Sequence, residues 1–483
     1  MPKKVLRAAT IGVLVASLAA QLTVPAAAAP SKLKWGACPP ESAALPQVGC
    51  ATLKVPLDYS KPNGRQITLT ISGVGSLAAK HALMVNPGGP GAPGIGTEQM
   101  VRVGLSQELY DQYAVFSFDP RGVGASTPVS CGDTSKLVKH PALPCTPANA
   151  QQEAQRVQLA QRIAAQCGKY GKDLLPYITT ENAARDLDRI RIALGRDKLD
   201  YLGYSYGTKL GATYATLFPQ HTGRMVLNSV VDPLVSTYRT GFEQNPAFEA
   251  RADDLFQWIA ARDKEYHLGK TATAVEALWD KLHRDLAKKP AGGRAGAAEL
   301  EDVLASSLYT DDLWSSLADA IVQYRQGDPS GLLTITDQFA LQSVDPGLLA
   351  YNCIDPGWPR NWRTWHWDTS VSNRRAPHFA WSNTWFSAPC AFWPVTPKPS
   401  VRIGSTKVPP ILLIQGRRDP ATPVIGARRM QAVLHGSRLL LEDGGNHASY
   451  LQQQNPCIDQ SAEKYLLTGR VPTGNVSCPA GGS

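Results

Sequence analysis

The sequence predicts an α/β fold, with a mostly parallel sheet, helices on both faces and a large, mainly helical insertion that forms a lid. Three observations support this fold class. Short apolar runs that end in turn residues alternate with helical patterns up to about residue 233, a long helical stretch follows, and the strand-then-loop pattern returns after about residue 400. Such alternation is typical of a parallel sheet covered on both faces.

The first part of the predicted core, residues 30–233, is a succession of strands and helices. Apolar β-type runs recur along it, at 53–57, 66–74, 82–85, 113–118, 199–204 and 224–233. Residues 181–194 place apolar side chains at helical spacing, and a second helix is expected at about 206–218. These elements predict the strands and covering helices of the sheet.

Residues 234–399 form the predicted insertion. A helix is expected at 273–289, where Val275, Leu278, Trp279, Leu282 and Leu286 follow helical spacing. Seven of the 11 tryptophans lie between residues 351 and 394. The core resumes at residues 400–483, with strand-then-loop runs at 409–420 and 437–447.

Residues 1–29 predict a cleavable secretory signal peptide. A basic start, MPKKVLR, precedes an apolar stretch and a run of small residues suited to signal peptidase. As a membrane anchor the stretch is a poor fit, because Gln21 and Thr23 interrupt it and spanning a bilayer takes ~20 apolar residues. We therefore expect a secreted, extracellular protein that is not attached to a membrane after cleavage.

The composition argues against several classes of function. Hydrophobic residues make up 43% and charged residues 18% of the 483 residues, which excludes a disordered or fibrous chain. The net charge of +9 comes from scattered basic residues rather than a basic stripe, so we expect no nucleic-acid partner. No His-Glu-x-x-His pattern or clustered carboxylates suggest a metal site, and we expect neither metal nor cofactor.

All nine cysteines follow the signal segment, and an oxidising destination favours disulfides. Local pairing predicts Cys38 with Cys50, Cys353 with Cys390 and Cys457 with Cys478. Of Cys131, Cys145 and Cys167, two are left to pair, and the odd cysteine is expected to be unpaired and buried.

A nucleophilic serine is predicted in GYSYG, residues 203–207. The segment matches G-x-S-x-G and lies between a predicted strand and a predicted helix, the context of a nucleophile elbow. The turn forces the serine into an unfavourable φ, and Gly203 and Gly207 remove the Cβ atoms that would crowd it. Ser205 is therefore the predicted nucleophile.

The serine needs a base and an acid, which in this context follow it along the chain. Asp419 comes directly after the apolar run ILLIQG, and His447 follows the next run. Both lie in loops at the carboxyl ends of strands, where open α/β sheets collect their sites. We expect Asp419 to orient His447; Glu442 and Asp443, just before the histidine, fit less well as the acid.

The oxyanion donors are predicted at two backbone amides. One is that of Tyr206, directly after the nucleophile. The other belongs to the loop NPGGPG at 86–91, where we favour Gly89, with Gly88 as the neighbouring alternative. The same loop formally satisfies G-x-G-x-x-G, but its prolines remove donors that a pyrophosphate would need, which disfavours a dinucleotide site.

Together these motifs resemble the secreted tripeptidyl aminopeptidases of Streptomyces-type bacteria, serine exopeptidases of the α/β-hydrolase fold that are related to prolyl aminopeptidases. The resemblance rests on segments spread over nearly the whole secreted chain: NPGGPG (86–91), FDPRGVGAS (118–126), GYSYGT (203–208), VVDP (230–233) and DPATP (419–423). It implies the same catalytic triad, the 86–91 loop at the oxyanion, and cleavage from a free N-terminus. In one departure, many relatives have glycine directly before the histidine, where this chain has Asn446; the change leaves the base intact and bears on the shape of its loop.

We therefore predict a secreted serine exopeptidase that forms an acyl-enzyme on Ser205. By the resemblance it releases short peptides, tripeptides above all, from substrates with a free N-terminus. The alternative is a secreted carboxylesterase or lipase of the same fold, because a triad alone does not separate amide from ester cleavage. The intact triad disfavours a non-catalytic binding protein. We expect a monomer.

An exopeptidase must also bind the substrate ammonium, for which a carboxylate in a region largely closed to water is suited. The insertion that roofs the site is expected to supply it. Glu243 and Asp355 are the first candidates, ahead of Asp232, which ends VVDP and is expected to be structural.

Overall fold

The structure is a computed structural model that describes residues 33–40, 42, 44, 47–339 and 344–481. All of these belong to one compact unit, Lys32–Ser483. The predicted signal peptide at residues 1–29 lies outside the described residues.

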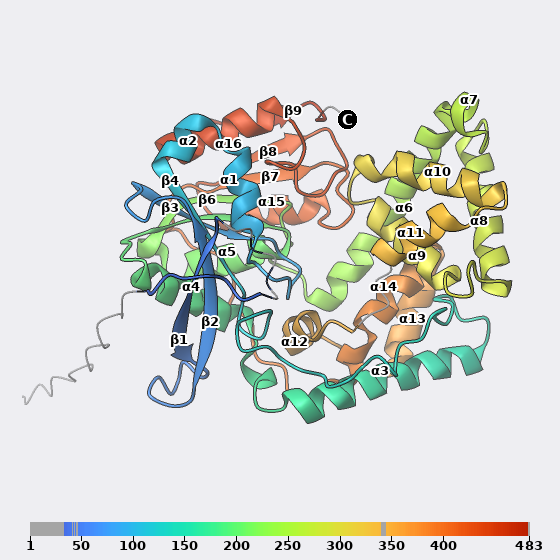
Figure 1. Ribbon diagram of the computed structural model, residues 1–483, viewed down its shortest axis with the longest axis horizontal. Coiled ribbons are helices and arrows are strands. Elements are labelled where there is room, and N and C mark those ends of the chain that lie inside the picture. The colour runs from blue at the N-terminus through green and yellow to red at the C-terminus, as the bar shows by residue number, and fades with distance from the viewer. Residues whose placement is uncertain (1–32, 41, 43, 45–46, 340–343, 482–483) are drawn as a thin grey trace, which may run out of the picture. The chain divides into compact units, whose positions relative to one another are not determined.

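Nine strands of the described chain form a single, mostly parallel sheet, as predicted (Figure 1). Their order is β1-β2-β4-β3-β5-β6-β7-β8-β9. The first two pairings, β1 with β2 and β2 with β4, are antiparallel, and all the others are parallel. The strands are β1 (Gly49–Pro56), β2 (Gln66–Val74), β3 (His81–Asn86), β4 (Tyr113–Phe118), β5 (Leu199–Tyr204), β6 (Thr222–Asn228), β7 (Leu412–Gly416), β8 (Arg438–Glu442) and β9 (Val476–Cys478).

Helices cover both faces of the sheet, also as predicted. Successive strand residues point to opposite faces, so on β5 Tyr201 enters one apolar core and Leu202 the other. The first core includes side chains of α4 (Thr180–Ala193), α5 (Tyr206–Leu217) and α15 (Val424–Val433). The second includes side chains of α1 (Thr97–Gly104), α2 (Gln107–Gln112) and α16 (Pro456–Thr468).

The carboxyl ends of the central parallel strands meet along one edge of the sheet. Asn86 at the end of β3 pairs with Gly203 of β5, and Tyr204 pairs with Asn228 at the end of β6. The loops that follow β3, β5, β6, β7 and β8 therefore emerge side by side.

The insertion is helical and has an apolar core of its own. Helix α8 contributes Val275, Trp279, Leu282 and Leu286 to this core, which confirms the predicted helical spacing. The helices of the insertion are α6 (Thr237–Ala261), α7 (Asp263–Tyr266), α8 (Ala272–Lys288), α9 (Ala297–Ser307), α10 (Trp314–Arg325), α11 (Ser330–Phe339), α12 (Pro346–Ile354), α13 (Trp362–Asn373) and α14 (Ala380–Ser387), with 3₁₀ turns η3 (Asp311–Leu313) and η4 (Ala388–Phe392).

The tryptophan-rich segment forms a continuous stack of indoles. Neighbouring ring centroids along it lie 5.0–5.7 Å apart with interplanar angles of 7–21°. The order of the stack is Trp358, Trp365, Trp362, Trp385 and Trp381. The aromatic side chains thus join α13, α14 and the loop before them into one packed layer.

A long helix that we did not predict, α3 (Ala150–Gly171), packs against the insertion (Figure 1). Its Glu153 accepts a hydrogen bond of 2.8 Å from the indole of Trp362. Just before the helix, the carbonyl of Cys145 accepts a bond of 2.6 Å from Trp385 Nε1. The chain between β4 and α4 therefore helps to hold the insertion.

Four disulfides are present, and they include the three predicted pairs. These bonds join Cys38 to Cys50, Cys353 to Cys390 and Cys457 to Cys478. The fourth joins Cys131 to Cys167, which leaves Cys145 as the unpaired, buried cysteine. In the part of the chain that the structure describes, no helix is long and apolar enough to cross a membrane.

Candidate active site

Ser205 occupies a strained turn between β5 and α5. Its φ of 54° is a conformation that residues other than glycine rarely adopt. The flanking glycines show why the turn tolerates no side chains: a Cβ on Gly203 would lie 2.5 Å from the carbonyl oxygen of Gly207, and one on Gly207 would lie 2.7 Å from that of Asn86. The expected elbow geometry is therefore present.

Asp419 lies in the loop after β7 and is almost fully buried, with 1% of its surface exposed. Its carboxylate accepts hydrogen bonds from the amides of Ala421 and Thr422 (2.9 and 3.0 Å) and from the Thr422 hydroxyl (2.8 Å). Burial works to raise the pKa of this carboxyl, but His447 and the Thr422 donors outweigh it and hold the pKa below its ordinary value. Asp419 is therefore held as a carboxylate.

His447 lies in the loop after β8, residues 443–451, which we call the histidine loop. Its Nδ1 is 2.9 Å from one carboxylate oxygen of Asp419 and 3.0 Å from the other. The two weaker candidates for the acid have other partners: Glu442 binds Asn455, and Asp443 binds Arg417. With Asp419 at Nδ1, the imidazole keeps Nε2 available as a base.

The end of β6 ties the histidine loop to the nucleophile elbow. The carbonyl of Asn228 accepts a hydrogen bond of 3.0 Å from the amide of Ser205, and its side-chain oxygen accepts one of 3.3 Å from the amide of Ser449. Next to it, Ser229 Oγ accepts a bond of 2.8 Å from the amide of Ala448. Both loops are thus hydrogen-bonded to Asn228, at the end of β6.

The loop after β3 lies against the elbow, where the oxyanion donors were predicted. A Cβ on Gly88 would lie 3.0 Å from the Cβ of Ser205. The amide of Gly88 donates to Asn86 Oδ1 at 3.1 Å, whereas the Gly89 amide donates to no protein group in the described part of the chain. Tyr206 is the first residue of α5, so its amide has no acceptor within the helix.

Asp119, from the segment DPRG, anchors the far side of this loop. Its carboxylate accepts hydrogen bonds from the amides of Gly94 and Ile95 at 2.8 and 3.1 Å. A bond of 2.8 Å from the amide of Ala125 holds the carboxylate in turn. The loop that carries Gly89 is therefore fixed at both ends.

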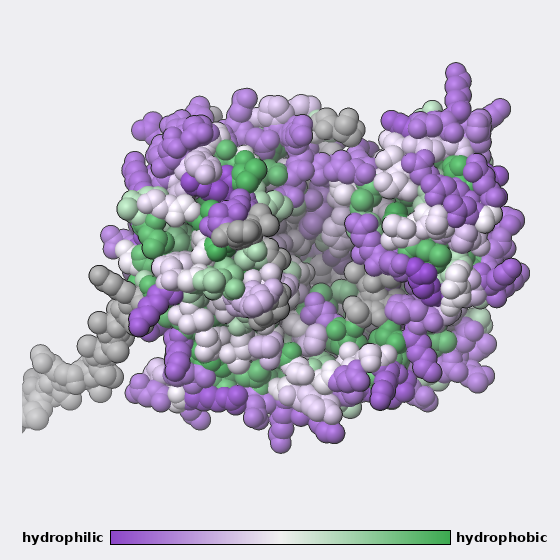
Figure 2. Space-filling view, viewed as in Figure 1, coloured by the Kyte–Doolittle hydropathy of each residue, from purple (hydrophilic) through white to green (hydrophobic). Residues whose placement is uncertain are grey.

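A cavity of about 820 Å³ lies between the sheet edge and the insertion. Gly89, Ser205 and Tyr206 line it from the core, and Phe248, Tyr309 and Trp385 are among the residues that line it from the insertion. Figure 2 shows the molecular surface hollowed between the sheet region and the helical insertion. The predicted nucleophile therefore faces a cavity that is partly roofed by the insertion.

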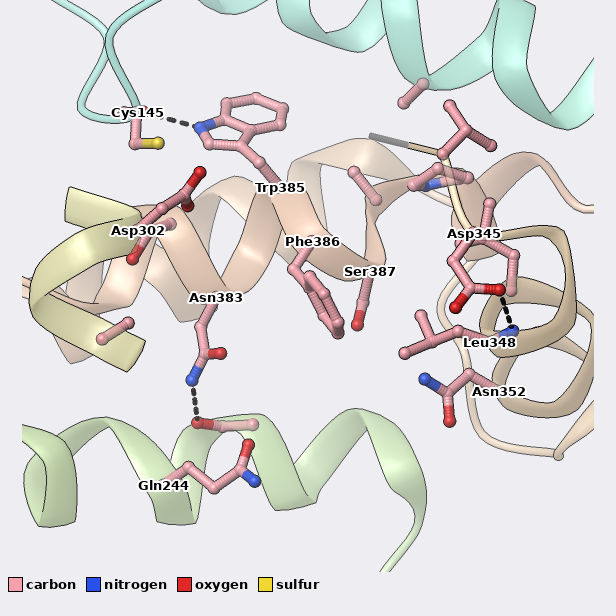
Figure 3. Close-up of a pocket in the computed structure, with 18 of the residues that line it drawn as sticks. Cys145, Gln244, Asp302, Asp345, Leu348, Asn352, Asn383, Trp385, Phe386 and Ser387 are labelled. Carbon is pink, nitrogen blue, oxygen red and sulfur yellow. Dashed lines mark hydrogen bonds between the residues drawn. The ribbon is translucent and has the colours of Figure 1, made fainter. Parts of the chain in front are cut away.

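Figure 3 shows part of this cavity, where side chains from four insertion helices converge. Asn383 and Phe386 come from α14, Gln244 from α6, Asp302 from α9, and Asn352 from α12. The wall here combines amide, carboxylate and aromatic groups, which suits a peptide better than a purely apolar ligand.

The structure places Glu243 and Asp232 at the cavity wall. Both carboxylates bind the guanidinium of Arg429, at 3.1 Å from Glu243 Oε1 and 2.5 Å from Asp232 Oδ2. Asp232 Oδ1 also accepts a bond of 2.8 Å from the amide of Leu234, so both of its oxygens are engaged.

Asp355, the other predicted ammonium ligand, is not among the residues that line the cavity. Its carboxylate forms an ion pair with Lys209 of α5 and accepts a 2.8 Å hydrogen bond from Thr237 of α6. In the structure it therefore ties the insertion to the core.

Three residues that support the site were not singled out for that role from the sequence. Thr422 binds Asp419, the carbonyl of Tyr309 accepts a bond of 2.7 Å from the amide of His447, and Asn446 binds groups of the insertion. Thr422 lies within DPATP, one of the segments that carry the family resemblance, so the sequence did point to this position. Tyr309 lies in the insertion, far from any motif, and only the folded chain brings it to the histidine.

No group of three His, Cys, Asp or Glu side chains among the described residues is placed to hold a metal ion. The site as described consists of Ser205, the Asp419–His447 pair and backbone amides. Such a set can perform nucleophilic acyl transfer without another group.

Comparisons with known proteins agree with this chemistry. Residues 376–478 match the family model described as "TAP-like protein". The tripeptidyl aminopeptidase of Streptomyces lividans is 40% identical over 472 residues, which cover 94% of this chain and 88% of that protein.

Two mycobacterial relatives have names that describe other hydrolase activities. The serine protease Hip1 of Mycobacterium tuberculosis (strain ATCC 25618 / H37Rv) is 30% identical over 460 residues, which cover 89% of this chain and 87% of that protein. Carboxylesterase B of the same strain is 29% identical over 452 residues, or 89% of this chain and 86% of that protein.

Proposed function

The chain belongs to the family of the Streptomyces tripeptidyl aminopeptidases, serine hydrolases of the α/β-hydrolase fold, and from that premise we propose that it is a secreted exopeptidase that releases tripeptides from free N-termini. The observation that carries this proposal is the 40% identity that extends over 94% of the chain, insertion included. The insertion roofs the cavity, so the similarity covers the substrate-binding part as well as the triad.

The chemistry proceeds in two acyl transfers. Ser205 Oγ attacks the scissile carbonyl while His447 Nε2 takes its proton, and His447 then protonates the leaving amine. A water molecule, activated by the same base, hydrolyses the acyl-enzyme and frees the peptide and the serine. Asp419, hydrogen-bonded to Nδ1, holds the tautomer and stabilises the imidazolium that forms in each step.

The developing oxyanion is stabilised by the amides of Gly89 and Tyr206. Gly89 is preferred to Gly88 because the Gly88 amide is already used by Asn86. Tyr206 adds the positive end of the α5 dipole to its own N–H. Both groups are fixed by the backbone, so they need little reorganisation as charge develops.

The dimensions of the cavity suit a short peptide. An extended tripeptide spans roughly 10 Å, and sites that enclose small ligands measure roughly 300–1,000 Å³. The cavity of about 820 Å³ falls in this range. A roofed cavity would accept a chain end rather than the middle of a folded protein.

Glu243 is our proposed ligand for the substrate ammonium. It lines the cavity, and among the described contacts only its Oε1 is engaged, with Arg429. Asp232 has both oxygens occupied, and Asp355 is held by Lys209 away from the cavity wall. Of the three carboxylates, Glu243 therefore has the most capacity to accept a hydrogen bond from a cation.

Secretion is proposed on the basis of the N-terminal segment and the four disulfides. Disulfides persist in oxidising compartments, and this chain has bonds in both the core and the insertion.

A substrate panel tests the proposal. Wild-type enzyme should cleave tripeptide-anilides with a free amine, and N-acetylated versions at least ~10-fold more slowly, since one lost charged hydrogen bond is worth about 1.5–3 kcal/mol. Equal rates on free and blocked anilides would overturn the exopeptidase assignment.

Ester hydrolysis is the second candidate function, favoured by the relative named carboxylesterase B. A preference for p-nitrophenyl esters over every peptide-anilide in the panel would support it instead.

A further inference from the structure

The histidine loop is held from two sides, by the core and by the insertion. The core holds residues on both flanks of His447: the carbonyl of Gly444 accepts a bond of 3.0 Å from the amide of Arg418, and the amides of Ala448 and Ser449 bind Ser229 and Asn228. None of these contacts is made by Asn446 or by the His447 amide.

The insertion holds the remaining part, at Asn446 and His447. The amide of His447 donates to the carbonyl of Tyr309 at 2.7 Å, and the Tyr309 ring stands edge-on to the imidazole, with centroids 5.2 Å apart. Asn446 Oδ1 accepts two bonds, from the amide of Asp311 at 2.9 Å and from Arg251 Nη2 at 3.0 Å. Tyr309, Asp311 and Arg251 all belong to the insertion.

Arg251 is a charged side chain that is almost completely buried beside the histidine loop. Its side chain is 1% exposed, its guanidinium lies 4.4 Å from the centre of the Trp314 ring, and it forms ion pairs with Asp254 and Asp311. Its Nε has no hydrogen-bond partner among the described residues. Burial lowers the pKa of this arginine to about 10, even though nearby aspartates oppose the shift.

Glycine 445 makes the approach of this arginine to the loop possible. A Cβ at that position would lie 2.5 Å from Arg251 Cζ. The guanidinium therefore packs directly against the backbone, beside the side chain of Asn446. Since a buried, incompletely paired cation is costly, a contact that brings it to the catalytic loop calls for a functional reason.

We propose that Asn446 is a positioning residue through which the insertion sets the orientation of the catalytic base. This inference rests on the proposed role of His447 and extends it: the base is competent only while the insertion is docked on the histidine loop. Asn446 accepts from two separate elements of the insertion, α6 and η3, and donates to Gln453 Oε1 at 2.7 Å, just beyond the histidine loop. It thereby joins three segments one residue before the imidazole.

The chemistry explains why an amide side chain suits this position. A carboxamide accepts two hydrogen bonds through one atom and donates from the other. Glycine would leave Arg251 and the Asp311 amide without their acceptor, and an apolar residue would do the same. Aspartate would keep the acceptor but lose the donor to Gln453.

The test compares Asn446→Ala with Asn446→Asp in the full-length enzyme. The rate at which a fluorophosphonate labels Ser205 is the main readout, because it needs the triad but no peptide. Displacement of a catalytic group by about 1 Å costs on the order of 100-fold, so we expect Asn446→Ala to label about 10- to 100-fold more slowly. Its kcat should fall by a similar factor with KM nearly unchanged, and Asn446→Asp should recover much of the loss.

Thr369→Val is the matched control. It removes a buried hydrogen bond of 2.7 Å between Thr369 and Thr384, inside the insertion and without contact to the histidine loop. A melting temperature lowered in both variants, with slow labelling only in Asn446→Ala, supports the proposal. Wild-type labelling and kcat in Asn446→Ala, or equal losses in the control, overturn it.

The outcome also separates this inference from the function on which it rests. If the wild-type enzyme is labelled but cleaves no tripeptide-anilide, the peptidase assignment fails and the comparison of labelling rates still decides the role of Asn446. If Ser205 in the wild-type enzyme is not labelled at all, the proposed base and its positioning fall together.

Discussion

The core and the insertion place their functional groups by different means. In the core, Ser205, Asp419 and His447 each lie in a loop just after a strand, and backbone geometry and hydrogen bonds to neighbouring loops fix them. In the insertion, residues such as Asn383 and Gln244 face the cavity from within helices, and their position depends on how those helices pack. Changes in the core should therefore act on chemistry. Changes in the insertion should act on substrate selection and stability, except at the groups that hold the histidine loop.

The largest effect is expected at Ser205, the proposed nucleophile of the core. Ser205→Ala should lower kcat by about 10⁶-fold, and Asp419→Asn by about 10⁴-fold, because the first removes the attacking atom and the second only the orientation of the base. Thermal melting should stay close to wild type for Ser205→Ala, since glycines on either side relieve the crowding of the turn. Activity of Ser205→Ala near that of wild type would refute the assignment of the nucleophile and the division of labour drawn above.

The next largest effect concerns the disulfides of the two regions. Loop-closure entropy predicts a loss of about 4 kcal/mol for the Cys353–Cys390 bond of the insertion and about 3 kcal/mol for the Cys457–Cys478 bond of the core, because they enclose separations of 37 and 21 residues. Replacing both cysteines of each bond by alanine and unfolding each variant in urea measures the two losses of unfolding free energy. A larger loss for the core pair would show that local packing, rather than loop length, decides these values.

A smaller, pH-dependent effect is expected within the insertion. Burial disfavours the charged form of His378, but hydrogen bonds and charges of Glu249 and Asp280 outweigh it and raise the pKa to about 9. The stabilisation is thus fully present below the unfolded pKa of about 6.5 and is lost as pH rises through about 9. It amounts to roughly 3 kcal/mol.

The difference in unfolding free energy between wild type and His378→Gln, measured from pH 6 to pH 10, isolates this contribution. It should be largest at pH 6 and fall to a smaller, pH-independent value by pH 10. A difference that does not change with pH would mean that the imidazole is neutral in the folded protein.

The smallest effect is expected for recognition of the substrate amine. Glu243→Gln should lower kcat/KM for free-amine tripeptide-anilides roughly 5- to 150-fold. This factor corresponds to about 1–3 kcal/mol of transition-state binding, the amount expected when a charged hydrogen bond is lost. N-acetylated substrates should hardly change. Asp355→Asn is the matched comparison: a selective loss for free amines in that variant alone would move the ammonium site to Asp355.

The sequence predicts the core of the molecule better than it predicts the insertion. The sheet, the elbow and the loops of Asp419 and His447 were predictable because turn chemistry leaves short, local patterns. The helix α3 was missed, although its buried residues Ile163, Ala164 and Cys167 lie on one side, because the polar residues between them hide the periodicity. Strand β9, only three residues long, gave no run to detect.

The part of the site that belongs to the insertion was less predictable. Asp355 was proposed for the substrate amine because it lies next to the tryptophan-rich segment, but its partner, Lys209, is 146 positions away in sequence. The contact of Asn446 with Arg251 spans 195 positions. Neither leaves a local pattern, since such contacts arise only when helices from distant parts of the chain pack together.

The stacked indoles of the insertion should give the protein a characteristic circular dichroism signal. Five tryptophan rings at centroid separations of 5.0–5.7 Å are close enough for their electronic transitions to couple. The circular dichroism of the intense indole transition should therefore contain a bisignate band that isolated indoles lack. Because all five rings belong to the insertion, the band would report the packing of the roof over the cavity without any attached dye.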